Sequence, residues 1–118
     1  MKKLVAILLL IASVPAQAQS WAHVGSAGDF EVYVDTSRLI RDGAFARFWI
    51  KRQRAQEQEG VAYFLSQVEI NCTAQTGRVL YTAAYGAAGA VVRTDPEPVP
   101  AEPIPPGTMY DDIRQQVC

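Results

Sequence analysis

Two thiols are the side chains of this sequence best suited to covalent chemistry: Cys72 and the terminal residue Cys118. They lie 46 positions apart, without the closely paired spacing of a zinc site or a thiol redox motif. An even number of cysteines in an exported chain indicates a disulfide instead. We therefore predict a Cys72–Cys118 bridge and no metal site.

The amino-terminal segment predicts that the chain is exported, as a disulfide requires. Lys2 and Lys3 precede an uncharged apolar stretch over residues 4–14, and Ala16-Gln17-Ala18 offers the small residues that a signal peptidase reads. Eleven apolar residues are too few for an uncleaved membrane anchor, which needs about 20. We expect residues 1–18 to be removed, with Ala16 as the alternative cleavage point, and residues 19–118 to form one domain. No cysteine lies at or near the cleavage point to carry a lipid anchor, so a periplasmic or secreted protein is expected.

The charge balance argues against nucleic acid or an anionic membrane as partner. Loss of two lysines leaves nine basic against twelve acidic residues in the expected mature chain, a net charge of −3. Basic residues gather in residues 38–54 and acidic ones in residues 95–112. Solvated faces that complement each other are the simplest interpretation.

His23 is the one imidazole available for acid–base or ligand chemistry. Asp29, Asp35 and several serines lie near it in the sequence, but no Gly-x-Ser-x-Gly elbow or similar nucleophile setting accompanies them. Haem or metal ligation with Tyr81 or Tyr85 is conceivable, although tyrosines in alternating strands usually serve packing. We therefore expect a structural or exposed histidine, no catalytic residue and no cofactor.

A run of cations around one tryptophan is the candidate binding site: Arg47, Trp49, Lys51, Arg52 and Arg54. The two-residue period of a strand places Arg47, Trp49 and Lys51 on one face, with Arg52 and Arg54 close by in the chain. Cations beside an exposed aromatic ring suit an acidic or glycan-rich ligand. The alternative is that Trp49 is covered by a helix or by Trp21, which would leave the cations scattered.

The elements that must position these residues are mainly strands. Alternating apolar and polar side chains predict strands over residues 30–35, 44–53 and 61–72, and Asp42-Gly43 supplies a turn signal between residues 38–40 and 44–53. Thr76-Gly77 then turns the chain into a predicted antiparallel strand over residues 78–85, and residues 91–94 form a final short strand. The polar segment 54–60 has almost no apolar residues and is predicted to be a mobile connection.

The carboxyl-terminal quarter differs from the rest. Six prolines in residues 95–106 predict an extended surface course that is excluded from a central strand. Thr108 and Asp111 then form a capping-box-like pair, and Met109, Ile113 and Val117 follow at helical spacing. We predict a short helix packed on the sheet. Such a helix is marginal alone, and the disulfide would fasten it.

Several short motifs, in order along the chain, resemble the surface-adhesin protein E family of bacterial envelope proteins. They are Trp21-Ala22-His23-Val24, Tyr33-Val34-Asp35 with Ser37, Phe48-Trp49, Val68-Glu69-Ile70-Asn71-Cys72, Tyr85-Gly86, Ile104-Pro105-Pro106-Gly107-Thr108 and Val117-Cys118. The resemblance implies an antiparallel sheet packed with helix, a disulfide-linked terminal helix and, in the named member, adhesion to host proteins.

The sequence departs from that pattern in two ways. The named adhesin is similar to a lipid-anchored protein, whereas this chain has no cysteine near its cleavage point, and residues 61–72 contain no Lys or Arg that would make a basic adhesive strand. We predict an α+β domain of five or six antiparallel strands and a short helix, which binds an envelope or host protein or polymer without catalysis. The alternative is a periplasmic structural or accessory protein with no host ligand.

Overall fold

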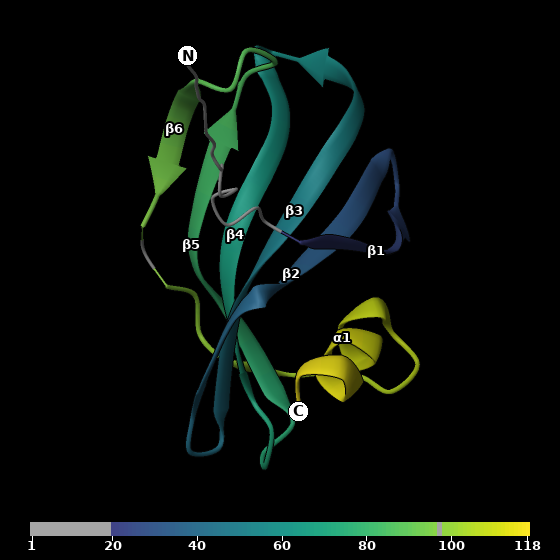
Figure 1. Ribbon diagram of the computed structural model, residues 1–118, viewed down its shortest axis with the longest axis vertical. Helices are drawn as coiled ribbons and strands as arrows, with labels where there is room; N and C mark the ends of the chain where they lie inside the picture. The colour runs from purple at the N-terminus through teal and green to yellow at the C-terminus, as the bar shows by residue number, and fades with distance from the viewer. Residues whose placement is uncertain (1–19, 97) are drawn as a thin grey trace, which may run out of the picture.

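The computed structural model describes residues 20–96 and 98–118, so the predicted signal peptide lies outside the described residues. Within these residues the chain forms one antiparallel sheet and one helix, as predicted (Figure 1). The elements are β1 (Trp21–Ala27), β2 (Phe30–Asp42), β3 (Phe45–Gln58), β4 (Val61–Asn71), β5 (Thr76–Tyr85), β6 (Val91–Asp95), β7 (Glu102–Pro103) and α1 (Met109–Val117).

The strands follow one another in the sheet in the order β1 to β6, each antiparallel to the next, and β7 adds two residues beside β5. Every connection between β1 and β5 is therefore a hairpin. The predicted turn at Asp42-Gly43 is confirmed, with Gly43 at φ 61°. This topology needs only short loops and places side chains from neighbouring strands side by side.

Two local predictions were wrong. Residues 54–58 continue strand β3 instead of forming a mobile connection, and a tight turn at Glu59 and Gly60, with φ of 54° and 78°, joins β3 to β4. A left-handed conformation at both turn positions matches the right-handed twist of a hairpin, and Gln58 pairs with Val61 directly across this turn. The turn after β4 spans residues 72–75 instead of Thr76-Gly77, because the Asn71 side chain accepts hydrogen bonds from the backbone N–H of residues 73 and 74.

The hydrophobic core lies between α1 and one face of the sheet, which we call the helix face. Val34, Phe48 and Ile50 of the sheet are at most 2% exposed and pack with Ile113 and Val117 of the helix. Figure 1 shows that α1 lies beside one half of the sheet only, so the other half of the helix face is left without helical cover. The predicted apolar stripe of the helix is confirmed.

The helix begins at the predicted capping pair, with one difference. The Thr108 hydroxyl accepts a hydrogen bond from the Asp111 N–H at 3.2 Å, while the Asp111 carboxylate accepts from Gly107 N–H at 3.0 Å, one residue earlier than a capping box requires. Arg114 also donates to Asp111, at 2.8 Å. The hydrogen bond from Gly107, followed by that from Arg114, holds the pKa of Asp111 below its ordinary value.

The proline-rich segment runs as an extended strap over β5, which confirms its predicted course. The Val99 N–H donates to the Val79 carbonyl and the Ile104 N–H to the Gln75 carbonyl, both at 3.0 Å. The Ile104 side chain packs on Gly77, where a Cβ atom would meet it at 3.4 Å. The strap therefore leads the chain along the edge of the core to the helix.

Candidate ligand-binding surfaces

The predicted disulfide is confirmed: Cys72 and Cys118 are bonded, with their Cα atoms 5.7 Å apart. Cys72 follows β4, where its N–H donates to the Ala44 carbonyl at 2.7 Å, and Cys118 is the C-cap of α1. The bridge ties the end of the helix to the hairpins at one end of the sheet. Among the described residues no cysteine is free.

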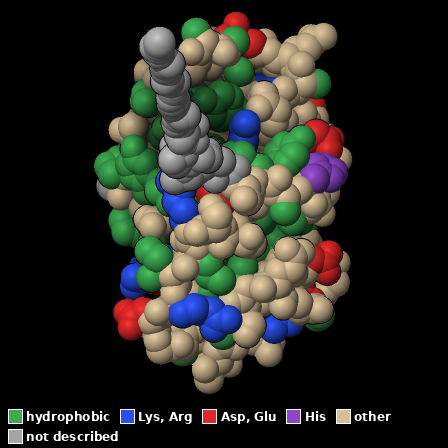
Figure 2. Space-filling model, viewed as in Figure 1, with side chains coloured by type: hydrophobic (Ala, Val, Ile, Leu, Met, Phe, Trp, Pro, Cys, Tyr) green, Lys and Arg blue, Asp and Glu red, His purple; other side chains and the backbone are tan. Residues whose placement is uncertain are grey.

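The predicted cationic site is divided between two faces of the sheet. Arg47, Trp49 and Lys51 lie on the face away from the helix, which we call the far face, because they alternate with the buried Phe48 and Ile50. Arg52 and Arg54 are in phase with Ile50 and so lie on the helix face. Figure 2 shows Lys and Arg side chains in separate groups and not in one continuous patch. The five residues therefore do not share one face of the sheet, and a binding role for either group stays a prediction.

On the far face, Arg47 is occupied by an ion pair. Glu69, which is 6% exposed, accepts hydrogen bonds from Arg47 Nε at 2.9 Å and from Arg78 Nε at 3.0 Å. Burial alone would raise the pKa of Glu69, but the hydrogen bonds from Arg47 and Arg78 outweigh it and the pKa is lowered. A charge held this way is poorly available to a ligand.

The other predicted far-face residues belong to an aromatic surface. Trp49 packs edge-on against Tyr81, with ring centroids 6.0 Å apart, and is half-buried. The Lys51 ammonium lies 4.8 Å from the centroid of the Tyr63 ring and 5.9 Å from that of Trp21, and Tyr63 stacks on Tyr85 at 4.9 Å. Trp49 is thus neither covered by the helix nor fully exposed.

On the helix face, Arg52 and Arg54 form a cluster with residues that sequence reasoning missed. The members, which we call the arginine–phenylalanine cluster, are Phe30, Arg52, Arg54, Phe64 and Arg93. The guanidinium carbons of Arg52, Arg54 and Arg93 lie 4.8, 5.5 and 5.9 Å from the centroid of the Phe64 ring. Phe30 packs edge-on against Phe64 at 5.9 Å and contacts Arg52 and Arg54.

The register of the sheet brings this cluster together. Arg52 pairs with Phe64, and Phe64 and Arg93 both pair with Ala84, so the three side chains form a row across β3, β4 and β6. The two-residue alternation of a strand was enough by itself to place Arg52 and Lys51 on opposite faces of the sheet. Only the pairing of β5 with β6 brings in Arg93, which is 41 positions from Arg52 in the sequence.

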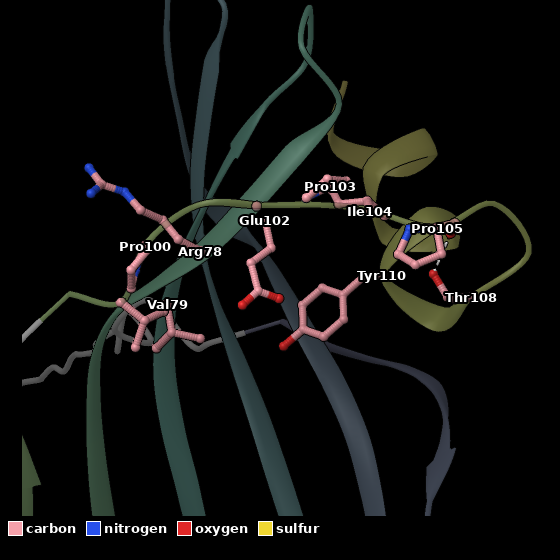
Figure 3. Close-up of a pocket in the computed structure, with 11 residues that line it drawn as sticks. Arg78, Val79, Pro100, Glu102, Pro103, Ile104, Pro105, Thr108 and Tyr110 are labelled. Atoms are coloured by element: carbon pink, nitrogen blue, oxygen red, sulfur yellow. Dashed lines mark hydrogen bonds between the residues drawn. The ribbon is translucent and has the colours of Figure 1, made fainter.

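A cavity of about 330 Å³ lies on the same face, beneath the strap. Figure 3 shows Tyr110 of α1 and Glu102 of the strap projecting alongside Val79 of β5. Burial raises the pKa of Tyr110 above its ordinary 10.0, and the positive charge of Arg52 opposes this shift.

The His23 side chain contacts a carboxylate and an aromatic ring. Its Nε2 lies 2.6 Å from Glu31 Oε1, and its ring packs edge-on against Tyr33 at 5.2 Å. Hydrogen bonds from Ser26 and then from His23 lower the pKa of Glu31. Figure 2 shows the histidine at the rim of the molecule, beside an acidic side chain. The edge strand β1 thus places His23 in an exposed hydrogen bond with Glu31.

The tyrosines proposed as its partners in metal or haem ligation lie elsewhere. Tyr81 and Tyr85 are on β5, separated from His23 on β1 by three strands. Within residues 20–96 and 98–118, no three His, Cys, Asp or Glu side chains come together as a metal site. The same residues contain no helix of the length and apolarity that crossing a membrane requires.

Comparisons with known proteins bear on this architecture. Comparison with curated proteins found no match. The family model described as surface-adhesin protein E matches residues 21–118, from the first strand through the terminal cysteine. That span includes the sheet, the strap, the helix and both bonded cysteines. The chain belongs to the surface-adhesin protein E family.

Proposed function

We propose that this protein is a non-catalytic binding protein of the cell envelope, and that the arginine–phenylalanine cluster contacts an anionic segment of a protein or polymer ligand. Family membership supports an adhesin-like surface protein. The single observation that supports the anionic ligand is the gathering of three guanidinium groups around Phe64.

The electrostatics of the cluster support this proposal. Distances through the Phe64 ring place any two of the three guanidinium carbons at most about 11.4 Å apart, so an effective dielectric constant of about 20 gives a repulsion of at least about 1.5 kcal/mol per pair. No ion pair between described residues includes Arg52, Arg54 or Arg93. An anion bound between them would relieve the repulsion and accept charge-assisted hydrogen bonds.

The phenyl rings of Phe30 and Phe64 also favour an anionic ligand. Rings beneath the guanidinium groups hold them by cation–π contact. Arg54 also donates from Nη1 to Gln58 Oε1 at 2.9 Å and its Nε is buried, so only part of its guanidinium group is open to a ligand. Arg93 is exposed, and Arg52 and Arg54 are half-buried. Sulfated or carboxylated segments carry the planar or tetrahedral oxygen groups that guanidinium binds best.

The test is binding of dextran sulfate and poly-glutamate to the purified protein, measured at two salt concentrations. Replacing Arg52, Arg54 and Arg93 by Gln one at a time should weaken binding about five- to tenfold each, or roughly 1 to 1.4 kcal/mol. Binding should also weaken with added salt. Lys51→Gln is the matched control, since it removes one cation from the far face. Equal losses in Lys51→Gln and Arg52→Gln would refute the assignment.

Surface display needs its own experiment. An adhesin must be reachable from outside, so a membrane-impermeant amine label should modify Lys51 on intact cells, with a known periplasmic protein as the unlabelled control. Labelling only after the outer membrane is opened would favour the periplasmic accessory role instead.

A further inference from the structure

A second candidate site lies on the far face, around Asp35. Its strand pairing places it between two tryptophans, because Asp35 pairs with Trp21 of β1 and with Trp49 of β3. Asp35 is 0% exposed. An aspartate so deeply buried needs strong partners, since removing a carboxylate from water is costly.

Only one of its two carboxylate oxygens has hydrogen bonds. Oδ1 accepts from the Ser37 N–H at 2.9 Å and from the Ser37 hydroxyl at 2.5 Å. Oδ2 is buried and accepts no hydrogen bond within the described structure. Arg38 Nε lies 3.5 Å from Oδ2, close enough for a charge contact but not aligned for a hydrogen bond. Oδ2 is therefore an acceptor that lacks a donor.

This carboxylate lines a cavity of about 240 Å³. Its lining consists of aromatic and aliphatic side chains with one carboxylate and one guanidinium group: Trp21, Asp35, Arg38, Trp49, Leu65 and Tyr85. Apolar walls with a few fixed polar groups are the usual composition of a small-molecule site. The volume is below the 300–1,000 Å³ typical of drug-sized ligands, so the cavity suits a single small ring.

The charges around the cavity favour a neutral ligand. A cation would be repelled by Arg38 and by Lys51, whose ammonium is 5.9 Å from the centroid of the Trp21 ring. An anion would be repelled by Asp35. A neutral ring with several hydroxyl groups avoids both repulsions. One hydroxyl would donate to Asp35 Oδ2 and a neighbouring one would accept from Arg38. Its C–H face would lie on an indole ring, whose face is electron-rich.

We propose that this cavity binds one neutral sugar unit, with Asp35 as hydrogen-bond acceptor, Arg38 as donor and Trp21, Trp49 and Tyr85 as apolar walls. The site is independent of the anionic ligand proposed above, since it lies on the other face of the sheet.

Tryptophan fluorescence tests this directly, because both tryptophans of the chain line the cavity. The probes are the methyl glycosides of glucose, galactose, mannose and N-acetylglucosamine. At least one should give a saturable change with a Kd near 1 mM, the order expected for about a dozen heavy atoms of ordinary ligand efficiency. Tetramethylammonium and glucuronate serve as the cationic and anionic probes.

Three variants locate the binding. Asp35→Asn should weaken it at least tenfold, and Leu65→Phe, which fills the cavity without touching a polar group, should abolish it even if the first variant folds poorly. Tyr81→Phe is the matched control beside Trp49 but outside the lining, and should bind as the wild type does. The proposal is overturned if no neutral glycoside gives a saturable change, if only a charged probe does, or if Leu65→Phe binds normally.

Discussion

Removing the disulfide should have a large effect that the structure allows us to estimate. The perturbation is the double variant Cys72→Ser with Cys118→Ser. The bridge closes a loop of 46 residues, and the chain-entropy model gives about 4 kcal/mol for a loop of that length. For a domain of this size, whose unfolding free energy is expected to be about 5 to 15 kcal/mol, that is a major share.

The packing of α1 explains why the protein should remain folded at low temperature. Ile113 and Val117 are at most 1% exposed, and burying side chains of this kind contributes about 1.5 to 3 kcal/mol each. The helix should therefore stay docked on the sheet without its covalent link. The loss should appear mainly as a less restricted unfolded chain, and the folded structure should change little.

The assay is thermal unfolding followed by circular dichroism. A loss of about 4 kcal/mol should lower Tm by about 15 to 30 °C in a domain of this length. Wild-type protein in reductant should approach the Tm of the double variant, and reductant should leave the double variant unchanged. A Tm within about 5 °C of the wild type would refute the reasoning. It would show that the hydrophobic contacts alone hold the helix and that the bridge adds little.

Three further changes test the rest of the structure. Glu69→Gln removes the acceptor shared by Arg47 and Arg78 and should cost about 1 to 2 kcal/mol in urea unfolding, a modest value because both arginines are about one-third exposed. Because the pKa of Glu69 is lowered on folding, its contribution is complete above pH 4.5 and is lost as the pH falls through the folded value, so wild type and Glu69→Gln should converge in stability in acid. Ile113→Ala should cost about 2 to 5 kcal/mol in the same assay, and a loss below 1 kcal/mol would mean that the helix is not packed as described. Thr108→Ala removes the N-cap and should cost about 1 kcal/mol, whereas Thr108→Ser should cost less than half of that.

Much of the fold could be predicted because the relevant signals are local. Alternation fixed which side chains of residues 44–53 share a face, and the Asp42-Gly43 pair located a turn. The spacing of Ile113 and Val117, with Thr108 before them, located the helix and its buried side. Residues 54–58 were predicted wrongly because they have no apolar alternation. Strand β3 continues through them, with Arg54 paired to Phe30 of β2 and Gln58 paired to Val61 of β4.

The candidate sites were less predictable because they are built across strands. Arg52 and Arg54 lie one and three positions after Lys51 in the sequence, yet they are on the opposite face, since successive side chains in a strand alternate between the two faces. Their true neighbours, Phe64 and Arg93, come from other strands. A positively charged segment in the sequence therefore became two separate surfaces in the fold.

The sequence by itself determined the kinds of element, the pairing of the cysteines and the side of the helix that is buried, because each depends on residue type and on spacing along one segment. The tertiary structure alone decided that Arg93 joins Arg52 and that Asp35 lies buried between Trp21 and Trp49. These contacts depend on the register between strands, which turns and the packing of the whole sheet set together.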